Sequence, residues 1–319
     1  MKHADSDITP QSLFASTELV ACINPDWAVL KASGEKVREY LQGQLTQDIE
    51  RLTSDKAIYS AVLTPKGKTV TDLYLLEGNH DELIILCPES RATALVERLR
   101  RFALGYQLRI GIVTSLSVLA IHGQKLNAHL QEAELPLPGS AHFAISRDES
   151  HDRIVMRTPD ALEAGVWVIS SKYDLDQLSH KMPTTNIQTL RSERILKGLP
   201  YFGVDWDEST LPLNANLIEF NGVSFEKGCY VGQEITSRMQ WRSLIKNRLY
   251  RVHLAAEPDT TPCRVMQNDI QAGNLTSTAK DARGEIFGIA YLNIEPAEAT
   301  QQLSLSNGIK IRVLDPCLL

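Results

Sequence analysis

The chain has 319 residues, of which 43 % are hydrophobic and 23 % charged, and this globular composition excludes disordered, collagenous and coiled-coil proteins. At roughly 150 residues per domain, the length predicts two or three domains. Asp and Glu number 39 against 33 Lys and Arg, so the net charge of −6 argues against direct nucleic-acid binding unless a local basic patch provides it.

The opening residues and the cysteines bear on the compartment. The first residues lack the charged and then apolar pattern of a signal peptide, and no apolar run approaches the roughly 18 residues that a membrane span needs. The cysteines are odd in number and scattered, without a Cys-x-x-Cys pair: Cys22, Cys87, Cys229, Cys263 and Cys317. This distribution argues against a disulfide framework or a zinc site. We therefore expect a cytoplasmic protein with free thiols and no bound metal.

The first 245 residues show strand and helix patterns that do not alternate regularly. Apolar runs broken by Gly, Pro or Asn predict strands at 27–33, 57–63, 69–76, 82–87, 107–114, 115–121, 153–157 and 165–170. Apolar residues at helical spacing predict helices at 37–45, 92–102, 125–132, 175–182 and 187–197. Because several strands follow one another directly, the pattern predicts an α+β fold rather than a doubly wound parallel sheet.

The pattern changes beyond about residue 246. Short strand-like runs follow at 249–254, 285–291, 302–305 and 309–314, and Asn307-Gly308 predicts a type I′ hairpin between the last two. These runs predict a small all-β barrel. We therefore expect an α+β region at 1–245, with two subdomains, and a barrel domain at 246–319.

One loop, at 225–234, combines glycine, cysteine and charged residues. Two glycines bracket Cys229, and glycine permits a tight turn or the close approach of a ligand. Lys227 precedes the thiol by two residues, and a nearby ammonium favours the nucleophilic thiolate. Gln233 and Glu234 could orient a polar ligand. The alternative interpretation is a buried cysteine in a turn, because free cysteines usually behave as small hydrophobic residues.

A run of basic residues starts in this loop. Between residues 227 and 251 Glu234 is the one acidic residue, and Trp241 and Tyr250 are interleaved with the cations. Such a run could hold a polyanion or the carboxylate tail of a small ligand. It could equally be a solvated strand and linker. The basic residues are Lys227, Arg238, Arg242, Lys246, Arg248 and Arg251.

Four segments resemble one known family. Residues 227–234 read K-G-C-Y-V-G-Q-E and resemble the K-G-C-Y-x-G-Q-E signature of YgfZ-type folate-binding proteins, relatives of the aminomethyltransferase (T-protein) of the glycine cleavage system. Residues 41–48 (L-Q-G-Q-L-T-Q-D), 65–68 (P-K-G-K) and 194–200 (R-I-L-K-G-L-P) are similar to further family segments in the same order. Arg238 and Arg242 also match the basic positions that follow the signature.

The resemblance implies a T-protein-like architecture, in which α+β subdomains and a C-terminal barrel form a ring around a central cavity that binds tetrahydrofolate. Trp27 matches a tryptophan that contacts folate, and a flat pterin suits an aromatic face. Leu190 stands where some members have a second tryptophan. Cys229 matches the thiol that the family is thought to need. The other residues that the resemblance places in the site are Lys227, Tyr230, Gln233, Glu234, Arg238 and Arg242.

The family's role implies a folate-binding accessory protein of iron–sulfur cluster assembly or repair, which indirectly supports tRNA methylthiolation. Its clients would be iron–sulfur enzymes such as a tRNA methylthiotransferase, and Cys229 would accept a one-carbon unit or ligate a cluster. The alternative is a tetrahydrofolate-dependent aminomethyl or one-carbon transferase assisted by Asp72, which stands where T-proteins carry an Asp pair. A third possibility is a binding module that docks a client or tRNA through the basic run.

Overall fold

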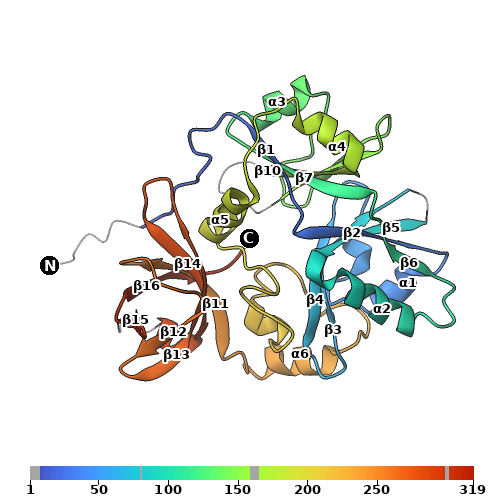
Figure 1. Ribbon diagram of the computed structural model, residues 1–319. Coiled ribbons are helices and arrows are strands. Elements are labelled where there is room, and N and C mark those ends of the chain that lie inside the picture. Colours follow the sequence, from blue (N-terminus) through green and yellow to red (C-terminus); the bar gives the residue numbers. More distant parts are fainter. Residues whose placement is uncertain (1–7, 80, 159–164, 299–301) are drawn as a thin grey trace.

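Two five-stranded sheets and a closed barrel surround a shared core in the computed structural model, which describes residues 8–79, 81–158, 165–298 and 302–319 (Figure 1). The predicted α+β architecture with a C-terminal barrel is therefore confirmed. Within the described ranges, no helix is long and apolar enough to cross a bilayer.

The first sheet is antiparallel, in the order β3 (Ile58–Leu63), β4 (Thr69–Glu77), β5 (Glu82–Pro88), β2 (Trp27–Ser33) and β6 (Arg109–Ile112). Helices α1 (Val37–Gln42) and α2 (Ala92–Phe102) pack on one face through alternate strand residues such as Ile58 and Val62. The residues between them, such as Tyr59, Ala61 and Leu63, face the shared core. All six residues of β3 are buried because both of its faces are covered.

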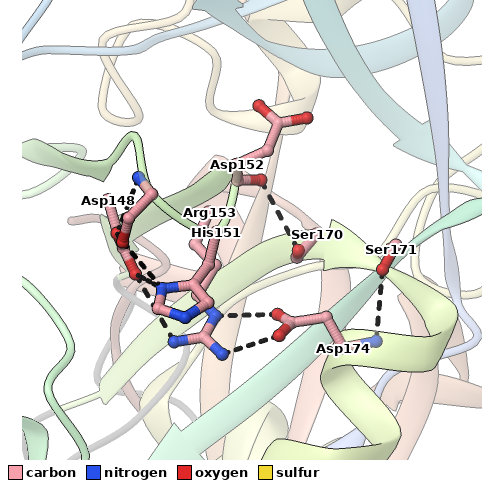
Figure 2. Close-up of polar contacts among 8 residues, drawn as sticks. Asp148, His151, Asp152, Arg153, Ser170, Ser171 and Asp174 are labelled. Carbon is pink, nitrogen blue, oxygen red and sulfur yellow. Dashed lines mark hydrogen bonds and ion pairs between the residues drawn. The ribbon is translucent and has the colours of Figure 1, made fainter.

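The second sheet is also antiparallel, in the order β1 (Val20–Ile23), β7 (Leu116–His122), β10 (Gly165–Ser171), β9 (Arg153–Arg157) and β8 (Ile145–Asp148). Helices α3 (Leu126–Glu132) and α4 (Lys172–Ser179) cover its outer face. Figure 2 shows how α4 is fixed: Arg153 donates to both carboxylate oxygens of Asp174, and Ser171 caps the helix by accepting from the Asp174 amide.

The segment between α4 and the barrel carries two α-helices. Helix α5 (Ile187–Lys197) begins at Asn186, whose side chain accepts from the Thr189 amide, and ends at Gly198, which has a left-handed φ of 80°. It packs against the barrel strands β13 (Ile270–Lys280) and β14 (Ile286–Asn293). The second helix, α6 (Gln233–Trp241), starts at the end of the loop at 225–234, which we call the signature loop. This helix was not predicted, because its sequence shows no clear apolar spacing.

The barrel closes in the order β11 (Asn247–Leu254), β14, β13, β12 (Cys263–Gln267), β15 (Leu303–Leu305) and β16 (Lys310–Pro316), with α7 (Ile294–Glu298) following β14. The last hairpin corrects one prediction. The Gly308 amide donates to the Leu305 carbonyl at 2.8 Å, and of the Asn307-Gly308 pair only Gly308 has a positive φ, at 87°. This is a type I turn followed by a bulge rather than a type I′ turn.

Candidate functional site

A cavity lies where the two sheets, α5 and the segment 199–220 meet. It holds about 740 Å³ of empty space, including the solvent at its open mouth. Three of the predicted site residues, Trp27, Asp72 and Leu190, line it together. Sequence reasoning missed the other residues that define its chemistry: Asp26, Tyr59, Tyr74, Trp167, Arg191, Arg194 and Tyr201.

The cavity has an aromatic wall centred on Trp27. Its ring lies 5.1 Å from that of Trp167, 5.2 Å from that of Tyr74 and 5.8 Å from that of Tyr201, measured between centroids. Trp27 opens β2 and Trp167 lies in β10, so the wall joins the two sheets across the shared core. An aromatic wall of this kind suits a planar heteroaromatic ligand.

One buried carboxylate faces this wall with an unused oxygen. Asp72 lies on β4 and is 3 % exposed. The Tyr59 hydroxyl donates to its Oδ2 at 2.7 Å, whereas its Oδ1 is buried without a hydrogen-bond partner from any other described residue. Burial raises the pKa of Asp72 to about 6, and the hydrogen bond from Tyr59 offsets this in part. A ligand that donates an N–H would satisfy this acceptor.

The raised pKa of Asp72 predicts a pH-dependent loss of stability. The folded-state pKa of about 6 lies above the value of about 3.9 expected in the unfolded chain, so the favourable contribution is complete below about pH 4 and is lost as the pH rises through 6. The Asp72→Asn variant lacks this titration. Its free energy of unfolding should therefore rise relative to wild type by about 2 kcal/mol between pH 4 and pH 8.

Urea unfolding at several pH values checks this expectation. The Asp55→Asn variant is a matched control, because Asp55 is an exposed carboxylate just before β3. A difference between wild type and Asp72→Asn that stays constant from pH 4 to pH 8 would contradict the assigned titration.

The mouth of the cavity carries charge. The Arg191 guanidinium binds both carboxylate oxygens of Asp26, at 2.9 and 2.5 Å, and the Tyr201 hydroxyl donates to the Asp26 backbone carbonyl. Arg191 keeps 44 % of its side chain exposed. A second guanidinium, from Arg194, lies one helical turn away and also lines the cavity. Arg194 is paired with Asp205 and is 14 % exposed, so the more exposed Arg191 is the group that can meet the carboxylates of a ligand that extends out of the cavity.

The contacts of Lys227 in the signature loop differ from those predicted. The Lys227 ammonium donates to the backbone carbonyls of Gln42, Leu45 and Gln47, at 2.7, 2.8 and 2.9 Å. Burial lowers its pKa to about 8, which is still above neutral pH, and the ammonium therefore remains protonated. Its three N–H groups match the three carbonyls. The proposed role of Lys227 in activating the thiol is therefore corrected: its ammonium is engaged in holding the turn after α1.

Further hydrogen bonds join the signature loop to the segment at 41–48. The Val231 amide donates to the Gly43 carbonyl at 3.1 Å, and the Thr46 hydroxyl donates at 2.6 Å to the carbonyl of Gly222, which lies just before the loop. Gly232 has a φ of 85°, and a Cβ there would lie 2.7 Å from the Thr64 carbonyl oxygen. The two motifs thus form one interlocked structure, which explains why they occur together in one sequence.

Cys229 is exposed in this loop and is not one of the residues that line the cavity. The loop packs at the end of β3, where Gly232 meets Leu63, while Tyr59 four residues earlier lines the cavity. At about 3.3 Å per residue, these two points on the strand are about 13 Å apart. The expectation that the thiol faces the folate cavity is therefore wrong, as is its alternative of a buried cysteine.

The other predicted site residues lie around this loop and also outside the cavity lining. Tyr230 is buried, and its amide donates to the Gln233 side chain. The basic run is divided: ion pairs join Arg238 to Glu234, Arg248 to Glu219 and Arg251 to Asp315. The run from Lys227 to Arg251 as a whole therefore does not form one basic patch. Arg242 is exposed beyond the end of α6.

Comparisons with known proteins agree with the predicted resemblance. No family model matches the chain. The chain is 26 % identical over 292 residues to the tRNA-modifying protein YgfZ of Yersinia enterocolitica, covering 89 % of this chain and 88 % of the relative. It is 25 % identical over 311 residues to the protein of the same name from Pectobacterium atrosepticum, covering 94 % and 90 %.

A solved structure supports the fold. The chain superposes on the glycine cleavage system aminomethyltransferase T from Bartonella henselae with a TM-score of 0.83 and 17 % identity, covering 95 % of this chain and 86 % of the other. The T-protein-like architecture expected from the sequence motifs is therefore confirmed.

Proposed function

We propose that this chain, a T-protein-like protein of the YgfZ type, binds a tetrahydrofolate in its central cavity and supports tRNA modification in the cytoplasm. The tRNA-modifying relatives span most of the chain, which supports the second part. The observation that carries the first part is the unpartnered Oδ1 of Asp72, buried in an aromatic cavity. A buried acceptor without a partner destabilises the fold, and a ligand donor would relieve that cost.

The ligand class follows from the cavity chemistry. A pterin is planar and carries N–H donors, so it fits both the aromatic wall around Trp27 and the free oxygen of Asp72. The glutamate tail of a folate is anionic and would meet Arg191, whose guanidinium is exposed at the mouth.

Fluorescence titration with 5-formyltetrahydrofolate tests the proposal. Trp27, Trp167 and Trp206 line the cavity, so ligand binding should quench the tryptophan emission of the wild type. The Trp27→Ala variant should bind at least about fivefold more weakly, since a stacking aromatic contributes roughly 1–3 kcal/mol to ring binding. Trp241 is exposed outside the cavity, so Trp241→Phe is the control and should keep the affinity. Equal affinity in wild type and Trp27→Ala would overturn the site.

We place the proposed link to iron–sulfur enzymes at Cys229, whose thiol is exposed to a partner. Because this thiol lies away from the cavity, a one-carbon unit would not pass directly from a bound folate to its sulfur. An iron–sulfur client enzyme would therefore contact Cys229 at the outer surface of the loop.

A second candidate function is a folate-dependent aminomethyl or one-carbon transferase. It is favoured by the pKa of Asp72, which burial raises to about 6 and so brings into the range of a general acid or base. Turnover of an aminomethyl donor by the pure protein, lost in Asp72→Asn, would establish this activity. Absence of turnover would leave Asp72 with a binding role.

A further inference from the structure

The last residue of helix α6 is an exposed tryptophan. Trp241 is 74 % exposed, although tryptophan is usually well buried in folded proteins. The ring of Phe225 meets it edge to face, with centroids 6.2 Å apart, and this contact fixes the orientation of the indole. Exposed and orientated tryptophans are typical of interaction surfaces.

Three basic residues flank Trp241 closely in the sequence. Arg238 lies on α6, Arg242 is the residue at which this helix ends, and Lys246 lies in the loop that follows. No carboxylate of the described residues lies within ion-pair distance of Arg242 or Lys246. Lys66 is exposed in the turn between β3 and β4, which packs against α6.

The carboxylates nearby are fewer than the cations. Glu234 pairs with Arg238, and Glu226 pairs with Arg51 at 3.7 Å. Glu295 is also close to Lys246, because the amide of the preceding Ile294 donates to the Lys246 carbonyl. Against these three carboxylates stand five cations, so the surface is net positive on a chain whose net charge is −6; the cations are Arg51, Lys66, Arg238, Arg242 and Lys246. Charge complementarity favours an anionic partner.

We propose that this α6 surface, formed by Trp241, Arg238, Arg242 and Lys246, binds single-stranded RNA, with the indole stacked on an unpaired base and the cations against the phosphates. An aromatic platform flanked by Arg and Lys is how proteins bind unpaired nucleotides without a sequence code. This reverses the expectation drawn from net charge. It goes beyond the proposed function because it needs no ligand in the cavity, which lies elsewhere.

Fluorescence polarisation with a fluorescein-labelled 12-nucleotide single-stranded RNA, at low salt and with the full chain, tests this. Trp241→Ala should weaken binding at least about fivefold, the smallest loss expected for one stacked base. The double variant Arg242→Glu, Lys246→Glu should also weaken binding and flatten its salt dependence. Tyr173→Ala is the matched control, because Tyr173 is 77 % exposed beside Lys172 on α4, and it should leave binding unchanged.

Several outcomes would overturn the proposal. They are no RNA binding by the wild type, equal binding of a fully paired duplex, or an affinity that Trp241→Ala does not change. Competition by poly-glutamate as strong as by RNA would point to an acidic protein instead. Titration of the same variants with 5-formyltetrahydrofolate separates this proposal from the cavity: retained quenching shows that the variant is folded and that the cavity site is intact.

Discussion

The Asp205→Ala variant should lose about 3–5 kcal/mol of its free energy of unfolding, the cost expected when one partner of a buried ion pair is removed. Asp205 is a buried carboxylate between α5 and the barrel. Its Oδ2 accepts from the Arg194 guanidinium at 2.7 Å and from the Tyr201 amide at 2.8 Å. Its Oδ1 accepts from the hydroxyls of Thr276 and Ser277, at 2.8 and 2.5 Å.

Alanine at position 205 would leave the Arg194 charge buried without its carboxylate and would detach β13 from the segment that lines the cavity. Urea unfolding followed by circular dichroism measures the loss. The matched control is Asp207→Ala, because Asp207 is exposed and caps only its own turn, by accepting from Ser209. We expect that control to lose no more than about 1 kcal/mol. Equal losses at the two positions would contradict the role given to Asp205.

The Lys227→Ala variant should lose about 3 kcal/mol or more, since a buried carbonyl left without its donor costs roughly 1–3 kcal/mol and Lys227 serves three of them. Lys246→Ala is the control, because that lysine is exposed and should change stability little. Urea unfolding measures both variants.

Thiol labelling distinguishes a structural role of Lys227 from thiol activation. If Lys227 only holds the loop, a destabilised Lys227→Ala variant should still label at Cys229 at least as fast as the wild type near pH 7. Unchanged stability together with slower labelling would show that the ammonium activates the sulfur, and would contradict the assigned contacts.

The sequence predicted the fold well where local patterns determine it. The apolar alternation at 57–63 and 69–76 corresponds to β3 and β4, and the helical spacing at 92–102 corresponds to α2. The barrel was expected from four short runs, although β12 and β13 were missed. Those two strands are rich in polar residues, because their outer face meets solvent, and so show weak apolar runs.

The site was predicted in part. Trp27 and Leu190 came from the family resemblance, and both line the cavity. Tyr59, Tyr74 and Trp167 were missed because they are far apart in the sequence and meet only when the two sheets pack together. Strand alternation could have placed Tyr59 and Tyr74 on the same face as Asp72, since strands β3 and β4 pair in register.

The loop at 225–234 shows where proximity in sequence misleads. Lys227 and Cys229 are two residues apart, yet the lysine is buried against the turn after α1 and the cysteine is exposed. The Lys227 side chain is long enough to bind carbonyl groups of another segment. Spacing along an irregular loop therefore does not determine which side chains come into contact. The motif identified the loop correctly but not its position relative to the cavity.

The central claim is that Asp72 receives a hydrogen bond from a folate in the aromatic cavity. The most direct test is isothermal titration of 5-formyltetrahydrofolate into the wild type and Asp72→Asn at pH 7.5. We expect the wild type to bind and the variant to bind at least about tenfold more weakly, the loss typical of one hydrogen bond to a charged group. No binding by the wild type, or equal affinity for the two proteins, would contradict the account.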